Sequence, residues 1–419
     1  MSFSWLRNIT AIAIRALSLA GKFLLVLCMV KYFQPSELGL YGVITALAAY
    51  GLFFLGLEFY NYTSRALVGA SNSEKVLIIR DQFILYGITF TFFSPLFYGI
   101  FYFNLFPSSL CFWFFIILIF EHASSEMLRI LVALAHPYLA NVIFFVRQGL
   151  WIYILLPIFY FCPPSRQFNI ILLAWIIGAA MSIFVGFIPL FHYPWSTIWK
   201  HPVRWNLMRE GLKVSRPFLI SAFCALSLLY IERFFVSYYC GLAAVGIYTF
   251  YAGLSITLHS LVNTGVAKMR LAQLLSAWKQ NDTKQFYLES MHMFKYTVIF
   301  VIAFSLISLI CVYPFVNLLN KAVYLEHINI FYILLLSAAA RSIADVPLYT
   351  LYAQHNDKLI LKINLSSFFI MIIGNTLLVP QLGLTGAAIS SAIASLVLLG
   401  YSSFFMLQRT IRPFLLIQS

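Results

Sequence analysis

Long apolar segments follow one another along almost the whole chain and restrict it to very few folds. We identify twelve, each about 20 residues or longer, the length a helix needs to cross a hydrocarbon layer of roughly 30 Å. Only 10% of the residues are charged and 62% are hydrophobic, whereas a soluble domain carries about 25% charged residues. Helices are predicted rather than open sheets, because a helix pairs its own backbone groups in lipid. The segments are 8–32, 38–64, 80–103, 108–132, 138–161, 168–191, 214–238, 243–265, 291–315, 328–352, 358–380 and 384–407.

Short markers recur in the two halves of the chain. Leu38–Gly42 (LGLYG) opens the second apolar segment, and Val245–Tyr248 (VGIY) opens the eighth, about half the chain length later. Gly178–Ser182 (GAAMS) and Gly386–Ser390 (GAAIS) are separated by nearly the same offset. A duplicated helical unit is typical of transporters that alternate access around a site between the repeats.

The apolar segments and the repeat predict an all-α polytopic membrane protein with about twelve transmembrane helices in two six-helix lobes. An even number of helices per repeat makes the lobes parallel in orientation. The lobes are expected at residues 1–191 and 214–419, joined by a cytoplasmic amphipathic linker at 192–213 that is rich in Trp, Pro and basic residues. Lys and Arg gather in alternate connections, so the positive-inside rule puts both termini in the cytoplasm. The net charge of +14 follows from this topology and from attraction to anionic lipids, without a nucleic-acid partner.

Enzyme signatures are missing from the sequence. It contains no P-loop, HExxH or GxSxG motif, and its six cysteines form no CxxC pair. We therefore expect no catalytic residues, no metal site and no cofactor. A proton or sodium gradient is then the expected source of energy for transport.

Three segments carry a resemblance to a known family. Pro35–Gly42, Ala244–Tyr248 and Leu382–Ile389 resemble the helix openings of lipid-linked oligosaccharide flippases, the O-antigen repeat-unit group of the multidrug/oligosaccharidyl-lipid/polysaccharide exporter superfamily. The resemblance implies two six-helix lobes that form a V around a central cavity. It also implies transfer of an undecaprenyl-pyrophosphate-linked oligosaccharide from the cytoplasmic to the periplasmic leaflet of the bacterial inner membrane. Such transfer serves O-antigen, lipopolysaccharide or other surface-polysaccharide biosynthesis, with membrane lipids and polysaccharide-assembly membrane proteins as partners.

Ionisable residues inside the apolar segments are the candidate site residues. Each costs roughly 2.5–3.5 kcal/mol in lipid and should face protein or water. Lys22 and Arg147 have no partner on their own helices, and a guanidinium fork suits a pyrophosphate. The predicted pyrophosphate-binding set is Arg15, Lys22, Arg147, Arg341 and Arg65, and the predicted ion-coupling acids are Glu58, Glu121 and Asp345.

Alternatives remain open for these residues and for the function. Arg15 or Lys22 is also suited to a structural pair with Glu58, and the i,i+4 spacing of Arg341 and Asp345 suits mutual neutralisation. A multidrug-type cation antiporter of the same superfamily is one functional alternative. An integral-membrane polysaccharide polymerase or ligase is another, but such enzymes usually carry a large charged outer loop, and the outer connections here are short.

Overall fold

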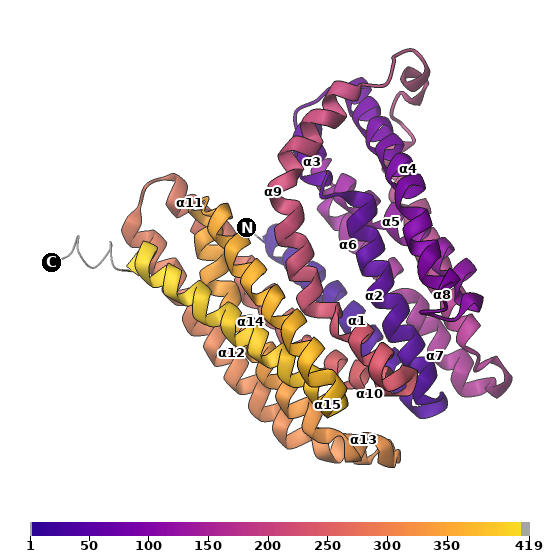
Figure 1. Cartoon of the computed structure of the whole chain (residues 1–419). Helices are drawn as coiled ribbons and strands as arrows, with labels where there is room; N and C mark the ends of the chain where they lie inside the picture. The colour runs from indigo at the N-terminus through magenta and orange to yellow at the C-terminus, as the bar shows by residue number, and fades with distance from the viewer. Residues whose placement is uncertain (1, 412–419) are drawn as a thin grey trace. The chain divides into compact units, whose positions relative to one another are not determined.

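The computed structural model describes residues 2–411, with side chains described for 13–410 except Pro217 and Lys268. Over this range the chain is helical and contains no strand, in agreement with the predicted fold class (Figure 1). The helices are α1 Ser2–Tyr32, α2 Pro35–Gly56, α3 Tyr60–Leu67, α4 Asn72–Tyr102, α5 Cys111–Ala133, α6 Pro137–Phe145, α7 Trp151–Phe161, α8 Phe168–Phe187, α9 Trp205–Tyr230, α10 Glu232–Val262, α11 Lys268–Lys279, α12 Thr283–Asn317, α13 Ala322–Glu326, α14 Ile328–Ala353 and α15 Asp357–Met406.

Nine helical stretches within the described residues are long and apolar enough to cross a membrane. Two of them, Phe218–Ala267 and Asp357–Thr410, are far longer than one crossing needs. Each is broken at a glycine with positive φ: Gly241 at 81° and Gly383 at 57°. Side chains other than glycine rarely adopt this conformation, so these glycines separate the helices that the sequence predicts as distinct segments. The 23-residue α5, which carries several ionisable residues, is not among the nine.

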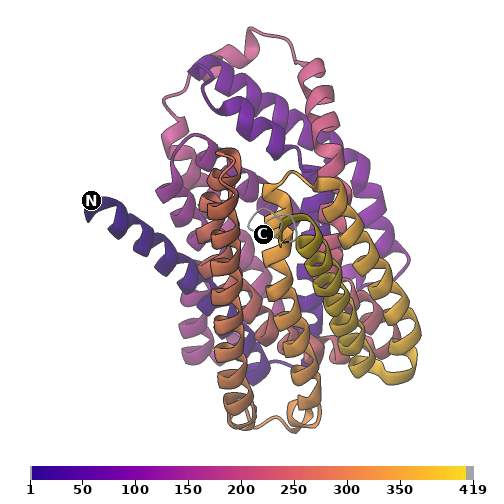
Figure 2. The same cartoon turned by 90° about the vertical axis from the view of Figure 1, so that its left-hand side faces the viewer.

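Two compact units make up the described chain. One comprises the residues up to Phe33 together with Ile44–Leu219, and the other comprises Gln34–Val43 together with the residues from Ile220 onward. The division falls inside α2 and α9, and the predicted linker at 192–213 lies wholly in the first unit. The first unit is built mainly by α5 against α8 and by α1 against α6, and in the second unit α14 packs against α10, α12 and α15 (Figures 1 and 2).

A buried carboxylate fixes the linker to the first unit. Asp81 on α4 is fully buried and forms ion pairs with Arg80 at 2.7 Å and with Arg204 at 2.7 Å. Arg80 also donates to the carbonyl oxygens of Ile198, His201 and Pro202 at 2.6–2.9 Å. The linker contains a 3₁₀ helix, Trp195–Trp199, and α9 starts at Trp205. The contacts of Arg80 and Asp81 fix the segment between them.

The repeated glycines are contact points between helices. In the second unit, a Cβ at Gly39 would collide with the carbonyl oxygen of Leu242, and a Cβ at Gly246 would collide with that of Pro35. The start of α2 and the middle of α10 thus cross with their backbones in contact, which only glycine permits. These two glycines belong to the markers LGLYG and VGIY, so the marker in each half of the sequence packs against its counterpart.

Candidate functional site

A π-helical turn, Val146–Leu150, separates α6 from α7 and carries Arg147. Such a turn adds one residue to the helical repeat and is frequent at functional sites. Gly149 in this turn packs against Ser18 of α1, and Gly21 of α1 packs in return against Gly149. The hydroxyl of Tyr153 donates to the carbonyl oxygen of Leu17 at 2.8 Å. These contacts hold α1 closely against the π turn and bring their polar residues together.

Glu121 of α5 is the centre of this site. Its carboxylate lies 3.4 Å from Nε of Arg147 and accepts hydrogen bonds from Nε2 of Gln148, at 3.3 Å, and from the indole of Trp175 on α8. Lys22 of α1 is near enough to both Glu121 and Arg147 to interact with them electrostatically. One acid therefore faces two bases, and the cluster carries a net positive charge.

Arg147 is not fully satisfied by the protein. Its Nε and Nη1 atoms are buried and have no hydrogen-bond partner among the described residues, although Nε faces Glu121. A buried polar atom without a partner is costly and requires an explanation. Lys22 is exposed. The pair thus offers free donors around a fixed carboxylate, which is suited to binding an anionic group with several oxygens.

The other predicted basic residues have surroundings of their own. Arg15 is exposed and donates from Nε to Asn141 at 3.1 Å, and Arg65 is exposed at the end of α3. Arg341 is buried in the second unit, where it donates to the carbonyl oxygen of Leu228. The structure therefore brings Lys22, Arg147 and Glu121 together, and it gives Arg15 and Arg341 other protein partners.

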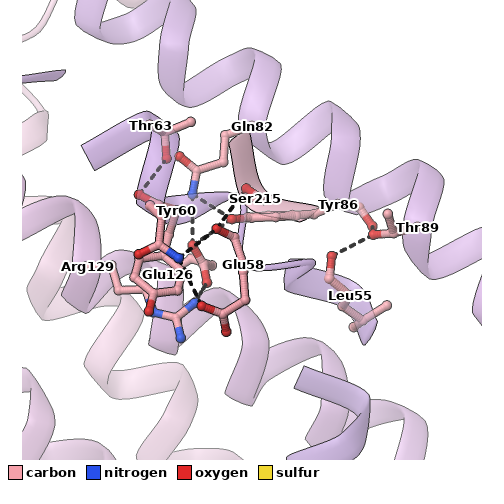
Figure 3. A network of polar contacts seen from close by, with 11 residues as sticks. Leu55, Glu58, Tyr60, Thr63, Gln82, Tyr86, Thr89, Glu126, Arg129 and Ser215 are labelled. Atoms are coloured by element: carbon pink, nitrogen blue, oxygen red, sulfur yellow. Dashed lines mark hydrogen bonds and ion pairs between the residues drawn. The ribbon is translucent and has the colours of Figure 1, made fainter. Parts of the chain in front are cut away.

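Glu58 lies at a break between α2 and α3, where its φ is +55° (Figure 3). Side chains satisfy the carbonyl groups that the break leaves open: Ser215 donates to Glu58 O at 3.1 Å and Thr89 donates to Leu55 O at 2.8 Å. The Glu58 carboxylate accepts from Asn61 at 2.9 Å. The Tyr60 side chain is also hydrogen-bonded to this carboxylate. Among the described residues, neither Arg15 nor Lys22 forms the ion pair with Glu58 that the sequence left open.

A fully buried carboxylate, Glu126, lies in the same region (Figure 3). It accepts from Nε2 of Gln82 at 2.8 Å and from the hydroxyl of Tyr86 at 2.7 Å, and it pairs with Arg129 one turn away. The Arg129 guanidinium also lies over the ring of Tyr60, 3.7 Å from its centroid. This network joins α3, α4 and α5 and leaves the Glu126 carboxylate well supplied with donors.

Asp345 belongs to a separate cluster in the second unit. Its carboxylate lies 3.1 Å from Nε2 of His259 and accepts from Asn263 at 2.6 Å. Asn263 opens a further π turn, Asn263–Ala267, and also donates to Tyr349 at 3.1 Å. Arg341 interacts electrostatically with both Glu232 and Asp345, but the ring that lies within hydrogen-bond distance of the Asp345 carboxylate is that of His259.

Uncharged polar residues were missed by the sequence reasoning, which looked only for ionisable groups. Gln148 and Trp175 complete the Glu121 site, and Gln82 and Tyr86 complete the Glu126 network. An amide inside an apolar segment is a usable signal, because it must also find partners in lipid. Among the described residues, no group of three His, Cys, Asp or Glu side chains is arranged to hold a metal ion.

Comparison with solved structures identifies the fold. No protein-family model and no curated protein sequence matches the chain. An inward-facing multidrug resistance MATE family transporter of the MOP superfamily matches with a TM-score of 0.71 and 15% identity, covering 94% of this chain and 98% of the other. The lipid II flippase MurJ in an inward closed conformation matches with a TM-score of 0.70 and 16% identity, covering 96% and 87%. This chain has the MATE/MurJ fold.

The match extends over nearly the full length of the chain. An outward-facing MATE family transporter also matches, with a TM-score of 0.52, 15% identity and coverage of 97% and 95%. Identities this low establish the fold and leave the substrate to be argued from the residues of this chain. The fold agrees with the polytopic, all-helical architecture that the repeat predicts.

Proposed function

We propose that this protein is a flippase that moves an undecaprenyl-pyrophosphate-linked oligosaccharide from the cytoplasmic to the periplasmic leaflet of the bacterial inner membrane. The proposal combines the MATE/MurJ fold with the motif resemblance to O-antigen repeat-unit flippases. Of the solved neighbours, MurJ is a lipid II flippase, so this fold accommodates lipid-linked cargo. Alternating access, rather than an enzymatic reaction, is the mechanism that we propose.

The observation that carries the proposal is the basic cluster in the first unit. Arg147 has buried donors without protein acceptors, and Lys22 is exposed beside it. Glu121 orients Arg147 without neutralising both bases. A pyrophosphate supplies several anionic oxygens and would satisfy these donors, with arginine binding through its fork and lysine as a mobile charge.

A cation antiporter is the second candidate, because a MATE transporter matches the chain as well as MurJ does. A drug cation would be bound by carboxylates with spare acceptor capacity. In the first unit, Glu121 and Glu126 are each already paired with arginine and supplied with neutral donors. The groups at the Glu121 site that lack a partner among the described residues are hydrogen-bond donors of Arg147, which favours an anionic headgroup over a cation.

Flipping by charge-neutral variants tests the proposal. Arg147→Gln and Lys22→Gln each remove a charge-assisted contact worth about 1.5–3 kcal/mol, so headgroup affinity should fall at least about tenfold. The measurement is transfer of an undecaprenyl-pyrophosphate oligosaccharide across reconstituted vesicles. Arg216→Gln and Lys213→Gln are the matched controls, since both residues are exposed on α9. Wild-type flipping by both site variants would refute the role of this cluster.

Coupling is proposed to use a proton or sodium gradient through Glu58, Glu121 or Asp345. Asp345 has the most suitable surroundings, because it shares its carboxylate with His259 and Asn263 next to a π turn. A cation bound at Asp345 would change the contacts that this carboxylate makes with His259 and Asn263, and so the packing of α10 against α14. Arg341 is proposed to act in the same unit by holding Leu228 rather than by direct contact with the acid.

A further inference from the structure

A cavity in the first unit is lined by none of the residues of the Glu121 site. It is a half-open groove of about 520 Å³ in the first unit, between α4, α5, the end of α8 and the 3₁₀ helix of the linker. This volume is typical of ligand sites. Its walls are apolar or aromatic side chains such as Phe83, Met127, Phe187 and Trp195. Arg80 is the only charged residue in its lining within the described chain.

Charged residues in and beside the groove lining have two roles. The Arg80 guanidinium donates to Asp81 and to carbonyl oxygens of the 198–202 segment. These hydrogen bonds hold the linker against the groove. Asp81 is neutralised by two arginines. Two residues beyond Ile198, which lines the groove, Lys200 is exposed. Lys75 is one helical turn before the lining residue Ile79, on the same face of α4.

We propose that this groove binds one acyl chain of an anionic phospholipid from the cytoplasmic leaflet, with its headgroup held by Lys200 and Lys75. The long apolar wall is complementary to a hydrocarbon chain, and the basic rim is complementary to a phosphate-containing headgroup. The positive-inside rule puts the start of α4 and the linker at the cytoplasmic surface, where anionic lipids attract basic residues. Exposed Trp199 and Trp205 are suited to the headgroup level on either side of Lys200.

The bound lipid would act as a structural element of the first unit. It would fill the space between α4, α5 and α8 and brace the linker from which α9 begins. The proposal is independent of the transported cargo, because it rests on a groove and a basic rim that lie outside the Glu121 cluster. Its consequence is a protein whose thermal stability depends on anionic lipid.

Two matched pairs of variants test the site in vesicles of phosphatidylcholine alone or with one-third phosphatidylglycerol. Ile84 lines the groove, and Ile88 is exposed one turn further along α4. Ile84→Trp should fill the groove and abolish the rise in Tm that phosphatidylglycerol gives the wild type, whereas Ile88→Trp should keep it. Lys200→Gln should weaken phosphatidylglycerol retention about two- to fivefold, the effect of losing one exposed charge pair, and Lys213→Gln should not.

The readout is the difference between the two lipid compositions, so a general loss of stability in a variant cancels. Retained lipid is also counted by native mass spectrometry after detergent extraction. The proposal would be overturned if phosphatidylglycerol raised the Tm of Ile84→Trp and Ile88→Trp equally. It would also be overturned if phosphatidylglycerol left the Tm of the wild type unchanged. Retention that instead follows added undecaprenyl phosphate would assign the groove to the cargo's prenyl tail and equally refute the phospholipid.

Discussion

Replacement of Glu126 by glutamine should destabilise the first unit without touching the headgroup cluster. The Glu126 side chain is fully buried, whereas its partner Arg129 is 33% exposed. Breaking a fully buried ion pair costs about 3–5 kcal/mol. Because Arg129 keeps partial contact with water and with the ring of Tyr60, we expect a smaller loss, of about 2–3 kcal/mol.

The geometry explains why glutamine is a poor substitute. The carboxylate accepts from the amide of Gln82, the hydroxyl of Tyr86 and the guanidinium of Arg129. A glutamine side chain has one acceptor oxygen, and its amino group would face donors rather than acceptors. At least one of the three donors would then lose this acceptor.

The assay is unfolding of the purified protein in mixed micelles by titration with dodecyl sulfate, with Glu326→Gln as the exposed control. A double-mutant cycle with Arg129→Met should show a coupling of about 1 kcal/mol or more between the paired side chains. Stability within about 0.5 kcal/mol of wild type in Glu126→Gln would refute this reasoning. It would indicate that the negative charge of Glu126 contributes little to the stability of the first unit.

Two further predictions concern packing and coupling. Gly246→Ala should destabilise the second unit by about 1–3 kcal/mol, because the added methyl group overpacks against Pro35. In Gly253→Ala, on the same helix, the methyl group meets open space and should stabilise the unit by about 0.5–1 kcal/mol. Unfolding titrations in which both variants shift stability in the same direction would contradict this prediction. Asp345→Asn should abolish the dependence of flipping on an imposed pH or sodium gradient in vesicles while the protein still inserts, and unchanged gradient dependence would direct attention to Glu58 and Glu121.

The sequence predicted the elements of this fold because membrane helices are specified locally. Each apolar segment satisfies its own backbone groups, so length and composition suffice to locate it. The markers LGLYG and VGIY indicated the duplication. Only the structure showed why glycine is required in them: Gly39 and Gly246 lie where two helix backbones touch. That contact joins residues separated by half the chain, and no local pattern encodes it.

The residues of the candidate site were likewise identified by the sequence, and most of their contacts only by the structure. The sequence by itself singled out Lys22, Arg147 and Glu121, because charge inside an apolar segment is costly whatever the fold. It did not determine which charges meet across helices, since that pairing depends on how the helices pack and on the register shift that the π turn at Val146–Leu150 introduces. The tertiary structure paired Glu121 with Arg147 and left donors of Arg147 open, whereas Glu126 and Arg129 stand one turn apart on α5, where spacing alone favours their pairing. Composition thus determined which residues must find partners, and helix packing decided which partners they found.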